Sequence, residues 1–274
     1  MKFMNRVKKF LKSDKLVTLV WIIGIVIIWE ICASIVAATK RTPVNVLPHL
    51  YDIIGSFFSD KMITGKMTMI ELIGSSCGET LLRAGYGFVI GTVLGYALAL
   101  LMNLSRIAEK IAFPYLMIIQ MIPILGMAPI ILAITGDINT SRIVIAAILT
   151  FYPVSTNTLA GFKAVEKEKR QLMYSYGASK LQLYTKTFIP YSIPYFFTGL
   201  KISAPMAITA SILVDTLQGG NGLGCMLSQS LKGGMSRLVF WDIVLISAVI
   251  GILSFYLMGV IERLICPYKR KSKG

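Results

Sequence analysis

The residues that could do chemistry in this 274-residue chain are few and widely spaced. The single histidine, His49, lies in a stretch bounded by Pro43 and Pro48, which leaves no place to assemble a Ser/His/Asp or Cys/His constellation. None of the cysteines forms a CxxC pair; they are Cys32, Cys77, Cys225 and Cys266. A disulfide framework or a metal site is therefore not expected. We expect the cysteines to be small buried thiols. We expect no covalent chemistry on this chain.

Nucleotide-binding motifs are missing from the sequence as well. Gly65-Lys66 lacks both the earlier glycine and the following hydroxyl residue of the pattern G-x-x-x-x-G-K-[ST]. The glycine-rich run 219–224 lacks the G-x-G-x-x-G spacing. No cofactor is therefore expected on this chain.

Polar side chains inside long apolar runs are the remaining candidates, because a charge in a membrane costs about 3 kcal/mol or more and normally faces protein or water. The set is Glu30, Gln120, Tyr152, Ser155, Thr156, Asn157, Lys201, Ser203, Thr209, Ser211 and Asp215. A smaller set of candidate functional residues within these runs is Gln120, Tyr152, Ser155, Asn157, Lys201, Thr209 and Asp215. Lys201 could instead form a structural salt bridge, which we favour, and Asp215 invites the same alternative. Serine and threonine hydroxyls often bond only to their own helix.

The apolar runs that carry these residues are long enough to cross a membrane. The chain is 55% hydrophobic, and Val17 to Ala38 contains one charge, Glu30, in a helix about 33 Å long. Six spans are predicted, at 17–38, 84–103, 113–135, 142–162, 187–214 and 240–262. Residues 1–15 have the spacing of an amphipathic interfacial helix, and we interpret the first span as retained rather than as a cleaved signal peptide.

The basic residues indicate which ends of the spans face the cytoplasm. Most of the 28 Lys and Arg residues fall in segments that share one side if the N-terminus is inside. Both termini and the segment 163–190 are then cytoplasmic, while 40–83 and 216–239 are external. The net charge of +15 thus reflects membrane topology, and no nucleic-acid partner is expected.

The segment 163–190 has the local signals of two helices joined at a glycine. A first helix can run to about Tyr176, Gly177 fits the left-handed position after a helix end, and Ser179 with Gln182 forms a capping-box pattern. Pro190 marks the entry into the next span. The segment also carries large side chains outside the lipid, which favour a protein partner over a merely solvated loop: Leu172, Tyr174, Tyr176, Leu181 and Tyr184.

This segment resembles the cytoplasmic EAA loop of ABC importer permeases, whose pattern is Glu-Ala-Ala, three residues, Gly, nine residues and Ile-x-Leu-Pro. Gly177 stands at the glycine, Thr187 at the isoleucine and Ile189-Pro190 at Leu-Pro. Gln171-Leu172-Met173 replaces the first triplet, so the glutamate is lost. The stretches 80–105, 113–136, 152–162, 176–183 and 193–202 are similar to permeases for sulfonate, taurine, nitrate and thiamine precursors. Asp215 stands where that family usually has Glu, with Gly222-Leu223-Gly224 following.

The resemblance implies an all-α membrane protein with about six transmembrane helices, a type I ABC importer permease-like bundle and a cytoplasmic coupling helix. It implies a multi-pass protein of the bacterial inner membrane that works with an ABC ATPase subunit dimer, an external substrate-binding protein and a second permease chain, either a copy or a relative. ATP would bind the ATPase subunit. The seven candidate functional residues within the spans, from Gln120 to Asp215, would line a translocation path. The residues it assigns to the ATPase-coupling loop are Gln171, Leu172, Tyr176, Gly177, Ala178, Ser179, Leu181 and Pro190.

We expect four segments along the chain. Residues 1–40 form an N-terminal amphipathic segment with the first span, and 41–83 form an external loop with short helices. Residues 84–262 form the core domain, and 263–274 form a basic tail.

Two other classes of protein are alternatives. An ion-gradient-driven secondary transporter favours an inverted repeat, and the sequence has no convincing one. A membrane-embedded enzyme needs a clustered nucleophile, base or metal set, which these residues do not offer.

Overall fold

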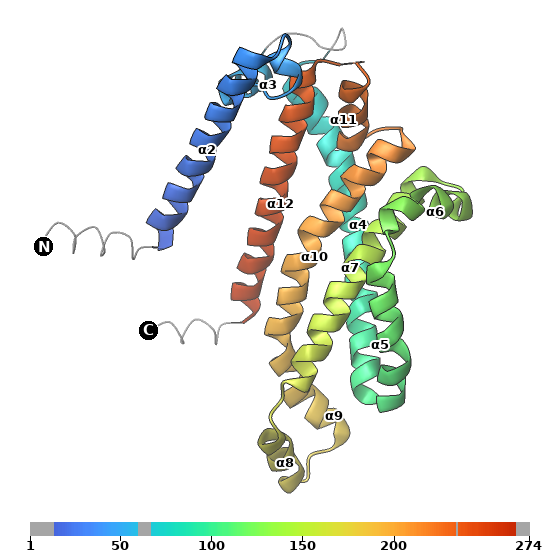
Figure 1. Ribbon diagram of the computed structural model, residues 1–274. Coiled ribbons are helices and arrows are strands. Elements are labelled where there is room, and N and C mark those ends of the chain that lie inside the picture. Colours follow the sequence, from blue (N-terminus) through green and yellow to red (C-terminus); the bar gives the residue numbers. More distant parts are fainter. Residues whose placement is uncertain (1–13, 60–66, 234, 267–274) are drawn as a thin grey trace, which may run out of the picture. The chain divides into compact units, whose positions relative to one another are not determined.

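The computed structural model describes residues 14–59, 67–233 and 235–266, and within these ranges every regular element is a helix (Figure 1). The predicted all-α fold is confirmed. The chain separates into two compact units, of which one contains residues up to 71 together with 230–242, and the other contains 72–229 and the chain from 243 onward. The predicted N-terminal amphipathic helix and nearly all of the basic tail lie outside the described residues.

The first unit contains a span and a short helix tied to its end. Helix α2 (Asp14–Thr39) is followed by a 3₁₀ turn at Pro43–Asn45 and by α3 (Leu50–Phe57). The Glu30 carboxylate accepts the backbone N–H of Leu50 at 2.8 Å and lies 2.7 Å from His49 Nδ1. Because the first N–H groups of a helix have no partner inside it, Glu30 satisfies one of them at the start of α3. The intramembrane Glu30 therefore anchors a helix of its own unit.

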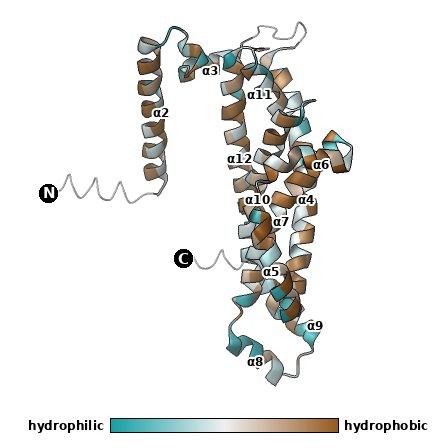
Figure 2. Cartoon of the chain, turned by 45° about the vertical axis from the view of Figure 1, so that its right-hand side comes forward, coloured by the Kyte–Doolittle hydropathy of each residue, from teal (hydrophilic) through white to brown (hydrophobic). Residues whose placement is uncertain are grey.

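Within the described ranges, five helices are long and apolar enough to cross a membrane, and a bent pair makes up to six. Figure 2 shows the largely hydrophobic colouring of these helices. Besides α2, they are α4 (Met69–Leu104), α7 (Ile138–Lys163), the continuous helix Lys180–Gln218 and α12 (Arg237–Ile265). Helix α4 begins at Met69, so residues 69–83, which we expected in the external loop, form its first turns. The described part of the chain thus agrees with about six spans.

The third predicted span, 113–135, is not one straight helix. Helix α5 (Arg106–Met121) and the segment Ile124–Thr135, which ends in α6 (Ala128–Thr135), meet at an angle of 82°. The break falls at Ile122 and Pro123, and Pro123 has no N–H to continue the α-helical hydrogen bonds. A short 3₁₀ turn, Ile124–Met127, connects the break to α6. The proline that the sequence placed inside a span therefore interrupts it.

Small residues bring α4 and α7 into close contact within the second unit. Gly87, Gly91 and Gly95 recur every four residues on one face of α4. A Cβ atom on Gly91 would lie 2.7 Å from Thr150 Cβ and would also collide with the carbonyl oxygen of Ala147. Such small-residue faces allow helix backbones to approach in a membrane, where lipid removes the hydrophobic drive for association.

Helices α7 and α10 (Ile189–Gln218) pack in the same manner and run side by side (Figure 1). A Cβ on Gly199 would lie 2.9 Å from the carbonyl oxygen of Pro153, and one on Gly161 would lie 2.8 Å from Tyr195 Cβ.

The connections between the helices define two ends of this unit, which we call the α8 end and the α11 end. The α8 end carries α8 (Lys167–Ser175) and α9 (Lys180–Leu183), and the α11 end carries α6 and α11 (Leu223–Leu231).

We predict that Gly91→Val destabilises the protein by about 1–3 kcal/mol, because the added side chain overfills the contact between α4 and α7. Gly85→Val is the matched control, since it lies on the same helix and a Cβ there meets nothing within 4 Å. The measurement is the thermal unfolding of the purified protein in detergent. Equal unfolding temperatures for the two variants would contradict the close packing.

Candidate functional site

The α8 end is built around a tightly capped glycine turn. Helix α8 ends at Ser175, and Gly177 has φ +67° with nothing within 4 Å of a Cβ placed on it. The N–H of Gly177 donates to the Tyr174 carbonyl at 2.9 Å, and that of Ala178 donates to the Met173 carbonyl at 3.0 Å. This pair of bonds is the Schellman motif, in which a left-handed residue closes a helix. The predicted conformation of Gly177 is confirmed.

A capping box starts the next helix, also as predicted. Ser179 Oγ accepts the N–H of Gln182 at 3.3 Å, and Gln182 Oε1 accepts the N–H of Ser179 at 2.8 Å. The helix then continues through a π-helical stretch, Tyr184–Phe188, into α10 without a break. Pro190, which we expected to mark the entry into the next span, lies within this continuous helix. It stands in the first turn of the α10 segment, and the preceding π-helical stretch accommodates its missing N–H.

Buried side chains fix this turn to the helix bundle. Leu183 and Phe188 join a core cluster with Phe162 and Leu116. The Tyr184 hydroxyl accepts from Asn103 Nδ2 at 3.0 Å and donates to the Asn103 carbonyl at 3.2 Å, which ties it to the last turn of α4. An ion pair between Lys163 and Glu109 joins α7 to α5 nearby. The segment is therefore fixed in position relative to α4, α5 and α7.

The opposite surface of the segment exposes large apolar and aromatic side chains. The exposed fractions are 55% for Leu172, 62% for Tyr174, 80% for Tyr176 and 74% for Leu181. Polar residues surround them and give α8 its hydrophilic colour in Figure 2. Of the other predicted coupling residues, Gln171, Ser179 and Pro190 are exposed and Ala178 is half-buried. A rigid turn with exposed aromatics rimmed by charge is typical of a protein-docking surface.

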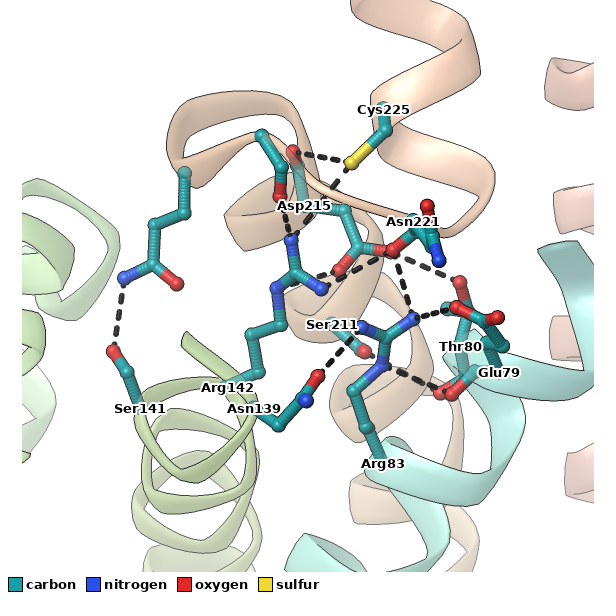
Figure 3. Close-up of polar contacts among 12 residues, drawn as sticks. Glu79, Thr80, Arg83, Asn139, Ser141, Arg142, Ser211, Asp215, Asn221 and Cys225 are labelled. Carbon is teal, nitrogen blue, oxygen red and sulfur yellow. Dashed lines mark hydrogen bonds and ion pairs between the residues drawn. The ribbon is translucent and has the colours of Figure 1, made fainter. Parts of the chain in front are cut away.

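A buried ion pair dominates the α11 end, as Figure 3 shows. Arg142 Nε lies 3.0 Å from Asp215 Oδ1, and both side chains are 1% exposed or less. Arg142 also donates to the carbonyls of Asn221, at 3.1 Å, and Gly219. Thr80 Oγ1 donates to Asp215 Oδ2 at 2.9 Å. The pair joins α4, α7 and α10 to the loop before α11.

A second arginine completes this cluster. Arg83 donates to the Asn221 carbonyl at 2.8 Å, to Asn139 Oδ1 at 3.0 Å and to the Glu79 carbonyl at 3.0 Å. Arg83 lies in the segment that we expected to be external and Arg142 at the start of a predicted span, yet only 7% and 1% of their surfaces are exposed. Their positions at helix ends next to apolar runs hinted at the membrane boundary, but a single sequence does not reveal which carboxylate on a distant helix they meet.

Two titratable groups at this end have shifted pKa values. Hydrogen bonds from the side chain and backbone of Thr140 lower the pKa of Asp137, which caps the start of α7. Burial raises the pKa of the Cys225 thiol. Its Sγ donates to the Asp215 carbonyl at 3.2 Å. Asp137 therefore stays ionised as a helix cap, and Cys225 stays a thiol that fills a polar gap.

The other predicted path residues do not gather at one place. Lys201 pairs with Glu262 of α12. The Ser155 hydroxyl is buried and donates to the Phe151 carbonyl at 2.8 Å, and Asn157 Nδ2 donates to the Pro153 carbonyl at 2.8 Å. Tyr152 is half-buried, while Gln120 and Thr209 are exposed on this chain. Across the described ranges, no three His, Cys, Asp or Glu side chains are arranged to hold a metal ion.

Comparisons with known proteins agree with this architecture. The family model described as "Binding-protein-dependent transport system inner membrane component" matches residues 91–265, which include the segment 163–190, Arg142 and Asp215. The chain is 28% identical over 250 residues to the formylaminopyrimidine transport permease protein ThiX of Halalkalibacterium halodurans, covering 90% of this chain and 94% of that protein. It is 27% identical over 263 residues to the nitrate import permease protein NrtB of Synechocystis sp., covering 96% and 94%.

A solved structure shares the fold. The structure of inward facing conformations of the MetNI methionine ABC transporter matches with a TM-score of 0.64 at 18% identity, covering 72% of this chain and 97% of that one. The class is therefore the multi-pass permease of ABC importers. The chain belongs to the family of binding-protein-dependent transport system inner membrane components.

We predict that Asp215→Asn destabilises the protein by about 3–5 kcal/mol, because Arg142 would remain buried beside a neutral partner. Glu79→Gln is the control; Glu79 pairs with Arg83 at 3.3 Å, but its side chain is 48% exposed, so the change costs at most about 1 kcal/mol. Thermal unfolding in detergent measures both. An Asp215→Asn protein as stable as the Glu79→Gln protein would show that the buried pair does not stabilise the fold.

Proposed function

We propose that this chain forms the translocation path of an ATP-driven importer and that an ATPase subunit docks on the α8 end. The observation that carries the proposal is the rigid glycine turn that exposes Leu172, Tyr176 and Leu181. Large side chains held in one geometry lose little further freedom on binding, so they suit a docking surface that must transmit force.

The charge distribution supports a cytoplasmic position for this surface. Lys163, Lys167, Lys169 and Arg170 precede or belong to α8, and Lys180 and Lys186 follow it. An excess of basic residues is retained on the cytoplasmic side of membrane proteins, and the same rule supports a cytoplasmic position for both termini. A cytoplasmic ATPase dimer can then reach the α8 end, and the α11 end faces the external binding protein.

The solute is proposed to be small and delivered by that external protein. Relatives are named as permeases for formylaminopyrimidine and nitrate, and a third, from Bacillus subtilis, for aliphatic sulfonates. All three are small polar molecules. Since several predicted path residues are bonded within the chain, the exposed Gln120 and Thr209 are the better candidates to face a path shared with a second permease chain.

Gly177→Val is expected to uncouple the permease from its ATPase. A left-handed conformation costs an L-residue about 1–2 kcal/mol, so the turn should distort and the amount of co-purified ATPase should fall about five- to thirtyfold. Gly136→Val is the matched control: Gly136 closes α6 with φ +68°, and a Cβ there also meets nothing within 4 Å. Unchanged ATPase binding by Gly177→Val would remove the α8 end as the docking site.

The double variant Tyr176→Ala, Leu181→Ala should weaken ATPase binding about tenfold or more without loss of folding, because exposed aromatic and apolar anchors carry much of an interface's energy. Tyr86→Ala with Leu94→Ala is the control, since these side chains of α4 are 62% and 54% exposed but lie in a span. Co-purification and solute uptake are measured in both. Uptake that persists in cells lacking the ATPase would instead favour a transporter driven by an ion gradient.

A further inference from the structure

A groove at the α8 end combines positive charge with an apolar wall. Helix α8 contributes Lys169, Leu172 and Met173 to it. The continuous helix Lys180–Gln218, which includes α10, contributes the other wall, with Lys186, Thr187, Pro190, Tyr191, Pro194 and Tyr195. No acidic residue is among these lining residues of the described chain.

The groove begins at the membrane surface and continues into a span. Tyr184, two residues before Lys186, is hydrogen-bonded to Asn103 in the last turn of α4, which marks the end of that span. The nine positions from Lys186 to Tyr195 correspond to about 13 Å along a helix axis. The lysine end of the groove is therefore at the polar boundary, while Pro194 and Tyr195 lie deeper in the bilayer.

The two lysines are available to an anion. Lys186 is exposed, and the described residues place no partner within ion-pair distance of it. Lys169 lies 3.4 Å from Glu166 in a pair whose side chains are about half exposed, and its Nζ is 4.9 Å from the centre of the Tyr191 ring. Exposed pairs of this kind contribute little, so Lys169 can exchange its partner at small cost. Tyrosines at this depth are typical of a lipid headgroup level.

We propose that this groove binds an anionic phospholipid, with Lys186 and Lys169 holding the phosphate and the wall formed by Pro190, Pro194 and Tyr195 covering the start of an acyl chain. A soluble anion would leave that apolar wall uncovered. An acidic protein surface would have to reach side chains that lie inside a span. A phospholipid carries both groups at the right separation, and basic pockets beside spans suit acidic headgroups.

The test measures phosphatidylglycerol binding to the purified full-length chain, without ATPase, by native mass spectrometry and by the shift in unfolding temperature. Lys186→Gln should bind phosphatidylglycerol roughly fivefold more weakly than wild type. Lys110→Gln is the matched control, because Lys110 is exposed at the same end on α5 but does not line the groove. Lys186→Arg should keep the binding and shows that the position tolerates substitution.

Several outcomes would overturn the lipid site. Phosphatidylcholine that binds as well as phosphatidylglycerol excludes recognition of a net negative headgroup, and glycerol 3-phosphate that gives the same shift excludes a role for the acyl chain. Equal losses in Lys186→Gln and Lys110→Gln indicate general charge attraction. A Lys186→Gln chain that loses only ATPase binding assigns the groove to the protein partner. The Tyr176→Ala, Leu181→Ala chain should retain lipid binding, because neither residue lines the groove, so failure of the docking proposal leaves this result separate.

Discussion

Close backbone contact between α7 and its neighbours α4 and α10 is the constraint on which the second unit depends. Lipid gives apolar helices no reason to associate, so the approach of the backbones must be stabilised by packing and by interhelical hydrogen bonds. Gly91, Gly161 and Gly199 allow that approach, since a Cβ at each would collide with the facing helix. The shared α7 then holds two neighbours in register, and this register decides which polar groups meet at each end of the unit.

The two ends use that register differently. At the α11 end, Arg142 and Asp215 are almost fully buried and form an ion pair, which fixes α7 to α10 there. At the α8 end, the side chains of Leu181 and Tyr176 remain largely exposed. One continuous helix of 39 residues, Lys180–Gln218, connects them over about 58 Å. The glycine turn and Asp215 therefore lie at opposite ends of one helix.

Much of this architecture could be predicted from local signals. The left-handed Gly177 and the capping box of Ser179 depend on neighbouring residues only, and the apolar length of the spans depends on the bilayer. The burial of Arg142 could not be predicted in this way, because it depends on a carboxylate that α10 supplies. The sequence also does not decide that Pro123 breaks a helix while Pro190 lies within a continuous one. A proline can break a helix or lie within one, and an arginine can be exposed or buried in an ion pair. Which of these occurs depends on the neighbouring helices, and one sequence does not give their positions.

Helix α8 has only nine residues, yet it takes part in two surfaces. Lys169, Leu172 and Met173 follow helical spacing and line the groove toward α10, while Gln171 and Tyr174 line a second groove with Lys180 and Leu183. A carboxylate at position 171 would place a negative charge beside Lys167 and Arg170; glutamine leaves those cations uncompensated. Gln171 therefore leaves the second groove more basic than a glutamate at this position would. A partner that binds one face must accommodate that charge, and any tilt of so short a helix changes the width of both grooves at once.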